Sequence, residues 1–144
     1  MNPKQKIKAA MIAPCGMNCG LCLAFQREKN HCAGCRGPQD QVFNYCSRCV
    51  IRNCRFFKTS TKKYCFSCPQ YPCTRMKQLD KRYRTRYKMS MFENLEEIKQ
   101  SGIRKFIAQE NKKWLCRYCG SLLCVHRKAC PACGKINRDL PGKK

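Results

Sequence analysis

Cysteine is the feature that constrains this chain most. Sixteen of its 144 residues are cysteine: eleven lie in residues 1–73, five in residues 114–144, and none in residues 74–113. The cysteine-rich parts have little regular apolar periodicity, so they cannot bury enough surface to fold by burial alone. Disulfides or metal ions must therefore cross-link them.

The cellular compartment decides between these two kinds of cross-link. The apolar stretch near the start, residues 9–13, is shorter than the roughly 7–15 residues of a signal peptide and leads directly to Cys15. We therefore expect a cytoplasmic protein, in which dense cysteine indicates metal ligands or redox chemistry. No apolar run approaches the roughly 18–20 residues that a membrane helix needs. The chain is also shorter than the about 250 residues of a complete eight-stranded α/β barrel.

The C-terminal cysteines form two C-x2-C knuckles, each followed by glycine, with ten residues between them. This spacing predicts a zinc ribbon with a short hairpin between the knuckles. Four thiolates leave no open coordination position, so the ion is expected to be structural. Cys124 and His126 lie between the knuckles and are possible extra ligands, although packing is the more ordinary role for both. The predicted ligands are Cys116, Cys119, Cys130 and Cys133.

The N-terminal cysteines follow the spacings C-x3-C-x2-C, C-x2-C and then C-x2-C-x4-C twice. Together with His31 they provide twelve potential ligands, enough for three tetrahedral zinc ions, and two sites plus free thiols fit the same residues. With the ion of the ribbon, this gives three or four ions in the whole chain. The spacing does not determine which cysteines share an ion. The predicted ligands are Cys15, Cys19, Cys22, Cys32, Cys35, Cys46, Cys49, Cys54, Cys65, Cys68 and Cys73.

Two other chemistries fit an array of this kind. Thiolates also hold iron–sulfur clusters, and the first triplet has the spacing of radical S-adenosylmethionine enzymes. Those enzymes need most of an α/β barrel, for which this chain is too short. Thiol–disulfide exchange would require a C-x2-C pair within a βαβ pattern, and none is visible. Zinc is therefore favoured, with an iron–sulfur or thiol redox protein as the alternative.

The cysteine-free middle of the chain is predicted to be helical. Met76, Leu79, Tyr83 and Tyr87 recur at helical spacing from a start near Thr74. A capping box of Ser90 and Glu93 predicts a second helix, which faces the core through Leu95 and Ile98 and stops at Ser101-Gly102. Ile103, Phe106 and Ile107 predict a third short helix.

The first of these helices carries the densest positive charge of a strongly basic chain. The chain has 31 Lys and Arg against 8 Asp and Glu, a net charge of +23. Seven like charges within fourteen residues repel one another unless an anion compensates them, so we expect a polyanionic partner, most plausibly RNA or a ribonucleoprotein. An acidic protein surface would satisfy the same charges. The predicted contacts are Arg75, Lys77, Lys81, Arg82, Tyr83, Arg84, Arg86, Tyr87 and Lys88, with the tyrosines stacking on bases.

These observations predict a small, metal-stapled α+β protein in three parts. Residues 1–73 form an irregular cysteine-rich metal-binding domain of zinc knuckles, residues 74–113 a basic helical segment, and residues 114–144 the zinc ribbon. The chain shows no phosphate-binding loop, paired carboxylates or Cys–His–Asp arrangement, so catalysis is poorly supported. A binding or scaffolding module is the function that we expect.

The whole pattern resembles the cysteine-rich domain of unknown function 3795 family. The matching pieces include Cys15-Gly-Met-Asn-Cys19, Cys32-Ala-Gly-Cys35, residues 49–54, residues 64–73 and residues 79–87. The C-terminal ribbon is similar to that of the longer members. The resemblance implies metal binding, with zinc as the expected ion, and it supplies no activity.

Overall fold

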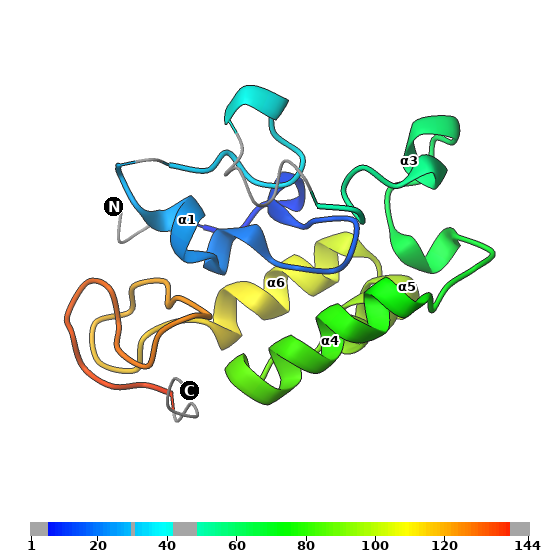
Figure 1. Ribbon diagram of the computed structural model, residues 1–144. Helices are drawn as coiled ribbons and strands as arrows, with labels where there is room; N and C mark the ends of the chain where they lie inside the picture. The colour runs from blue at the N-terminus through cyan, green and yellow to red at the C-terminus, as the bar shows by residue number, and fades with distance from the viewer. Residues whose placement is uncertain (1–5, 30, 42–48, 139–144) are drawn as a thin grey trace.

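Helices dominate the regular structure of this chain. The computed structural model describes residues 6–29, 31–41 and 49–138. Within these ranges β-structure is limited to three isolated bridges, so the expected α+β class is met only in part: the chain is small, cysteine-rich and mostly helical. The helices are α1 (Leu23–Gln26), α3 (Arg55–Thr59), α4 (Thr74–Tyr87), α5 (Met91–Ser101) and α6 (Ile103–Lys113), and short 3-10 turns cover Ala9–Met11, Cys19–Leu21, Gln39–Gln41 and Cys65–Ser67 (Figure 1).

The three longest helices begin where the sequence predicts, and α5 also ends there. α4 starts at Thr74, and the hydroxyl of Ser90 caps α5 by accepting a hydrogen bond from the Glu93 backbone N–H at 3.1 Å. α5 stops at Ser101, and α6 follows directly after Gly102. None of the helices in the described part of the chain has the length and apolar character that crossing a membrane requires.

One hydrophobic core joins the three helices to the cysteine-rich segments. Met76 of α4, Leu95 of α5 and Phe106 of α6 are all buried in it. The N-terminal segment runs over α6 (Figure 1), where the Ile7 backbone N–H donates to Asn111 Oδ1 at 2.8 Å and Asn111 Nδ2 donates back to the Ile7 carbonyl at 3.1 Å. The stretch between the two C-terminal knuckles also enters this core through Leu122, Leu123 and Val125.

A buried carboxylate links the N-terminal cysteine segment to the end of α6. Glu110 accepts hydrogen bonds from Asn18 Nδ2 at 3.3 Å and from the indole Nε1 of Trp114 at 3.1 Å. Burial raises the pKa of Glu110, while these two donors partly oppose the shift. Because both donors are satisfied in the interior, this small network fixes the first cysteine segment and the entrance to the C-terminal cysteines relative to α6.

The loop after Cys15 makes a close approach to α5. Gly16 has a φ of +91°, and a Cβ atom at this position would lie 2.9 Å from both Leu95 Cγ and the Met91 carbonyl oxygen. Asn94 Nδ2 donates to the Gly16 carbonyl at 2.9 Å. Glycine is therefore required here both by the backbone conformation and by the space available.

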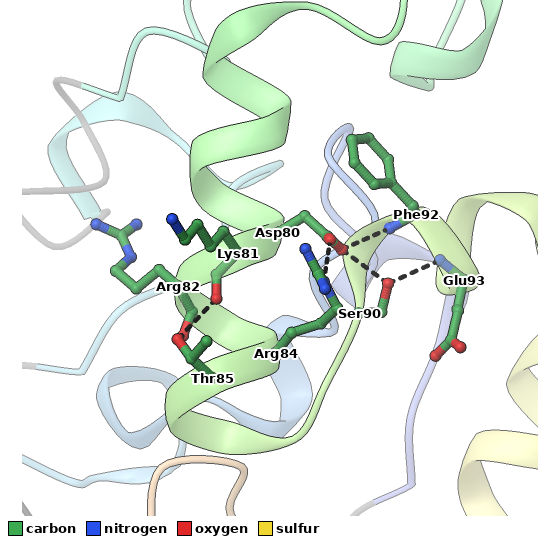
Figure 2. A network of polar contacts seen from close by, with 8 residues as sticks. All are labelled: Asp80, Lys81, Arg82, Arg84, Thr85, Ser90, Phe92 and Glu93. Carbon is green, nitrogen blue, oxygen red and sulfur yellow. Dashed lines mark hydrogen bonds and ion pairs between the residues drawn. The ribbon is translucent and has the colours of Figure 1, made fainter.

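A buried aspartate holds the end of α4 against the start of α5. One oxygen of Asp80 accepts hydrogen bonds from the Ser90 hydroxyl at 2.7 Å and the Phe92 backbone N–H at 3.2 Å, and the other accepts from Arg84 Nε at 2.6 Å (Figure 2). Burial alone would raise the pKa of this carboxyl, but the three donors outweigh burial and hold the pKa below its ordinary value. Asp80 therefore stabilises the fold in its ionised form.

Replacing Asp80 with alanine is expected to lower the free energy of unfolding by about 2–3 kcal/mol, because two buried donors lose their acceptor. In the wild type, the contribution of ionised Asp80 to the free energy of unfolding should be fully present above the ordinary pKa of aspartate. It should be lost as the pH falls through the lower pKa that Asp80 has in the folded state. Urea denaturation of Asp80→Ala measures the effect. Glu93→Ala, an exposed acid in the first turn of α5, is the control and should cost well under 1 kcal/mol. Equal costs for the two variants would contradict this role for Asp80.

Candidate metal centre and basic surface

Four C-terminal cysteines form a compact group of sulfurs. The Sγ atoms of Cys116, Cys119, Cys130 and Cys133, hereafter the four-cysteine site, all lie within 4.8 Å of one another. The Sγ–Sγ distance is 3.6 Å both from Cys116 to Cys133 and from Cys119 to Cys130. Zinc–sulfur bonds of about 2.3 Å in a tetrahedron place the sulfurs about 3.8 Å apart, so this spacing fits a single ion. The four-cysteine site could therefore hold a metal with the four ligands predicted from the sequence.

Two matching turns build the four-cysteine site. The Cys116 N–H donates to Ser121 O at 2.8 Å and the Gly120 N–H to Cys116 O at 2.9 Å, and the same pattern recurs around Cys130, Lys135 and Gly134. Both glycines have positive φ, 77° and 78°, as the predicted knuckles require.

The prediction of a hairpin between the two knuckles is wrong. The isolated bridges Leu115–Leu122 and Ala129–Ile136 enclose each knuckle separately instead of joining the two. The intervening stretch folds into the core because Leu122, Leu123 and Val125 are apolar and can be buried there.

Several N–H groups point at the sulfurs of the four-cysteine site. The backbone N–H of Tyr118 donates to Cys116 Sγ at 3.4 Å, that of Ala132 donates to Cys130 Sγ at 3.4 Å, and Asn137 Nδ2 donates to Cys116 Sγ at 3.3 Å. Desolvation opposes ionisation of Cys116, but hydrogen bonds from the backbone N–H groups of Cys119 and Tyr118, and then from the side chains of Asn137 and Cys133, outweigh it and lower its pKa to about 6. The site is therefore prepared to hold thiolates.

The four sulfurs nevertheless do not all ionise in the absence of a cation. The backbone N–H of Lys135 favours the Cys133 thiolate, but desolvation and the neighbouring Cys116, Cys119 and Cys130 outweigh it and raise the pKa of Cys133 to about 11. Close thiolates repel one another, and a divalent cation removes this repulsion. The chemistry of the donor set thus fits a metal ion.

Neither of the extra C-terminal ligand candidates belongs to the four-cysteine site. Cys124 is fully buried, and burial raises its pKa. His126 accepts a hydrogen bond from the Leu23 backbone N–H on Nδ1 at 3.2 Å, and its Nε2 lies 3.0 Å from the Tyr83 hydroxyl. Both residues therefore have the packing role that the sequence made the more ordinary one.

Seven of the described N-terminal cysteines lie in or against the main core, namely Cys15, Cys19, Cys22, Cys35, Cys49, Cys65 and Cys73. Within the part of the chain that the structure describes, no set of three or more His, Cys, Asp or Glu ligand atoms other than the four-cysteine site lies within 4.8 Å. Cys46 lies outside the described residues. His31 is exposed, and its ring packs against Phe25 with Nδ1 3.3 Å from the Arg27 carbonyl. The described N-terminal candidates are Cys15, Cys19, Cys22, Cys32, Cys35, Cys49, Cys54, Cys65, Cys68 and Cys73.

One backbone hydrogen bond and two from the Arg36 side chain bring three of the N-terminal cysteine segments together. The Cys65 N–H donates to the Pro14 carbonyl at 2.9 Å. Arg36 bridges the same two segments by donating to the carbonyls of Ile12 and Lys63, both at 2.7 Å. The segments that carry Cys15, Cys35 and Cys65 are therefore neighbours, although the sequence left their grouping open.

The electrostatics of the thiols support this grouping. Burial and then the charge of Cys35 raise the pKa of Cys15 to about 12, and Cys49 adds to the shift. Burial likewise raises the pKa of Cys65, with Cys15 adding most among its neighbours. Cys32 instead lies in a separate small cluster with Ala24, and Cys22 contacts both this cluster and the main core.

The basic side chains of α4 are exposed, whereas its two tyrosines are half-buried. Tyr83 and Tyr87 are half-buried and pack edge-on against His126, with ring centroids 5.7 and 4.8 Å away. This histidine, about forty residues away in sequence, packs against the two tyrosines, and their stacking on bases stays a prediction. The seven predicted basic contacts are all exposed, namely Arg75, Lys77, Lys81, Arg82, Arg84, Arg86 and Lys88.

Comparison with known proteins finds a family model that matches the N-terminal part of the chain. The model of a family described as a protein of unknown function (DUF3795) matches residues 11–78. The match covers 68 of the 144 residues, and this part of the chain is similar to the DUF3795 family. The match spans every N-terminal cysteine and the start of α4, and the four-cysteine site lies C-terminal to it. No curated protein and no solved structure matches the chain.

One contributor to the four-cysteine site, beyond the DUF3795 region, was missed from the sequence. Asn137 donates to Cys116 Sγ, and its Oδ1 accepts the Arg117 backbone N–H at 2.9 Å. Asn137, which follows the second knuckle in the sequence, therefore stabilises the first knuckle. The only sequence signal is its place just after Cys133, where the bridge at Ile136 returns the chain toward the site.

Proposed function

We propose that this protein is a zinc-binding module, without evident catalysis, that binds RNA or a ribonucleoprotein through the basic surface of α4. The observation that carries the proposal is the exposure of six cationic side chains on α4 and of a seventh, Lys88, at its C-cap. Arg84 pairs with Asp80 at 2.6 Å. Within the described residues, no carboxylate pairs with Arg75, Lys77, Lys81, Arg86 or Lys88.

Helical geometry arranges these charges in two rows. At 100° per residue, Arg75, Arg82 and Arg86 fall on one side of the buried stripe that contains Met76 and Tyr83. A second row falls on the opposite side and consists of Lys77, Lys81 and Arg84. Two parallel rows of cations suit an extended chain of phosphates, to which arginine and lysine donate charge-assisted hydrogen bonds.

Zinc is the ion that we propose for the four-cysteine site. Four thiolates and no open position are typical of a structural zinc, whose binding energy stabilises the fold. We propose zinc for the N-terminal cysteines as well, which gives three or four ions per chain. An iron–sulfur cluster at the N-terminal cysteines is the alternative outcome of a metal determination.

Charge reversal on α4 tests the RNA proposal. The double variant Arg82→Glu/Arg86→Glu is expected to weaken binding of a fluorescein-labelled 12-nucleotide oligouridylate by about tenfold or more at 0.1 M salt. The plot of log affinity against log salt should become shallower by about 1.4, since each lost phosphate contact removes about 0.7 for a single strand. The matched control is Arg104→Glu/Lys105→Glu, which changes the charge equally at exposed positions of α6. If wild-type binding does not respond to salt and both variants bind like the wild type, the nucleic-acid proposal is wrong, and an acidic protein surface becomes the better candidate.

A further inference from the structure

A pocket at the C-terminal end of α4, which shares Lys88 with the basic surface of that helix, combines several cationic side chains with the support of the four-cysteine site. Its volume is about 350 Å³, and it opens where the end of α4, the end of α6 and the first knuckle meet. Ligand sites usually begin at about 300 Å³, so there is space for a phosphate together with an attached sugar. The lining that bears on its chemistry comprises Lys88, Lys113, Trp114, Arg117, Asn137 and Arg138.

The charge of this pocket is entirely positive. Four of its lining residues are lysine or arginine and none is acidic. The Lys113 ammonium and the Arg138 guanidinium carbon lie 5.6 and 4.6 Å from the centre of the Trp114 ring. An aromatic ring attracts cations but does not neutralise them. The pocket therefore concentrates positive charge without an internal counter-ion.

Among the cations of the pocket, Arg138 has the charge that is least favourable to leave without an anion, because it is partly removed from water. It is about half-buried and donates to the carbonyl oxygens of Val125 and Tyr87, and within the described residues no carboxylate pairs with it. Removing a cation from water is unfavourable unless an anion lies close by. Burial accordingly lowers the pKa of this arginine. A bound anion would offset the cost.

The four-cysteine site holds two of the lining residues in place. Arg117 lies in the first knuckle, between Cys116 and Cys119, and Asn137 donates directly to Cys116 Sγ. Arg117 also donates a guanidinium N–H to the Asn137 carbonyl at 3.2 Å. The geometry of the pocket thus depends on the turns that position the four thiols, which gives the metal-binding segment a part in ligand recognition.

We propose that this pocket binds a phosphate group, which the RNA backbone supplies. The proposal rests on the proposed function for the choice of RNA, but the pocket itself is a second contact separate from the two rows on α4. Lysine and arginine are the side chains that proteins use for phosphate, because they donate several charge-assisted hydrogen bonds to its oxygens. Lys113 and Arg117 are the exposed donors, and Arg138 forms the inner wall.

Two double variants with the same change in charge test the pocket. Lys113→Gln/Arg117→Gln removes its exposed donors, and Arg104→Gln/Lys105→Gln removes one lysine and one arginine from the opposite end of α6. The pocket variant is expected to bind the labelled 12-nucleotide oligouridylate about tenfold more weakly than the control at 0.1 M salt, with a salt slope shallower by about 1.4. Metal content and circular dichroism should match the wild type, because both side chains are exposed.

Inorganic tripolyphosphate separates a free phosphate ligand from RNA. The pocket variant should bind it more weakly than the control by calorimetry. If the pocket variant loses affinity for tripolyphosphate but not for the oligouridylate, the pocket is still a phosphate site. Its ligand is then a free polyphosphate and not RNA. If the pocket and control variants bind both probes equally, the pocket proposal is overturned. In that case, loss of RNA binding in the α4 variant would leave the proposed function intact, whereas absence of RNA binding by the wild type would remove the proposed function alone.

Discussion

Replacing Cys133 with serine is expected to release the metal ion from the four-cysteine site and to leave the full chain largely unfolded at 25 °C. A structural zinc site contributes about 10 kcal/mol or more, and the margin of stability of a small domain is only about 5–15 kcal/mol. The effect should spread beyond the site because Leu122, Leu123 and Val125, between the knuckles, belong to the main core. Cys133 is exposed, so the substitution itself disturbs no packing.

Two further variants separate loss of metal from general damage to the C-terminal segment. Cys133→His keeps a zinc ligand and should retain both the metal and the folded state, since three cysteines and one histidine also make a tetrahedral site. Cys124→Ala removes a buried thiol outside the site and should keep the full metal content at a cost of about 1 kcal/mol. Two-dimensional amide NMR and metal analysis give both readouts. If Cys133→Ser retained a wild-type spectrum and metal content, the four-cysteine site would not be a metal centre.

His126 is expected to make the stability of the protein depend on pH between about 6.5 and 4. Burial, and then the positive charges of Arg138 and Arg127, lower its pKa from 6.5 to about 4. The unfolded chain therefore takes up a proton first as the pH falls, and stability decreases through this window. Between the ordinary pKa and pH 5 the loss amounts to about 2 kcal/mol, at 1.36 kcal/mol per unit.

The geometry explains why the folded state resists this proton. His126 Nδ1 accepts the Leu23 N–H, so Nε2 carries the ring proton and donates to the Tyr83 hydroxyl. A second proton on Nδ1 would break the bond to the N-terminal segment. His126→Gln should lower stability at pH 7 and should remove about 2 kcal/mol of the decrease between pH 7 and 5.

Urea denaturation at the two pH values measures this difference. Metal release in acid affects the wild type and the variant equally, so the difference between them reports on the histidine. The matched control is His31→Gln, which replaces the other histidine at an exposed position and should keep the wild-type decrease. An undiminished decrease in His126→Gln would show that another group carries the pH dependence.

Local signals in the sequence were sufficient for the three longest helices, α4, α5 and α6, but they did not indicate α1 or α3. The hydroxyl of Ser90 and the backbone of Glu93 are three residues apart, and the stop at Gly102 depends only on its neighbours. The inward stripe on α4 follows from helical periodicity, which places Met76 in the core. The ligands of the four-cysteine site were equally local, because each knuckle closes within a few residues.

Contacts between distant segments could not be predicted in this way. His126 contacts Tyr83 and Leu23 only in the folded chain. The sequence alone therefore does not indicate that a histidine packs against the tyrosines of α4. The stretch between the knuckles was expected to form a hairpin, whereas its apolar residues are buried against the helices. The positive pocket likewise draws on three separate segments, and no spacing in the sequence relates Lys88 to Arg138.

The metal content of the wild-type protein tests the central claim most directly. Elemental analysis and a visible spectrum of the full chain purified without oxygen are expected to show a colourless zinc protein, with at least one more zinc ion per chain than Cys133→Ser. Zinc has no visible absorption, whereas iron–thiolate centres are coloured. A metal-free protein, or a coloured protein whose four-cysteine site contains iron, would contradict the assignment.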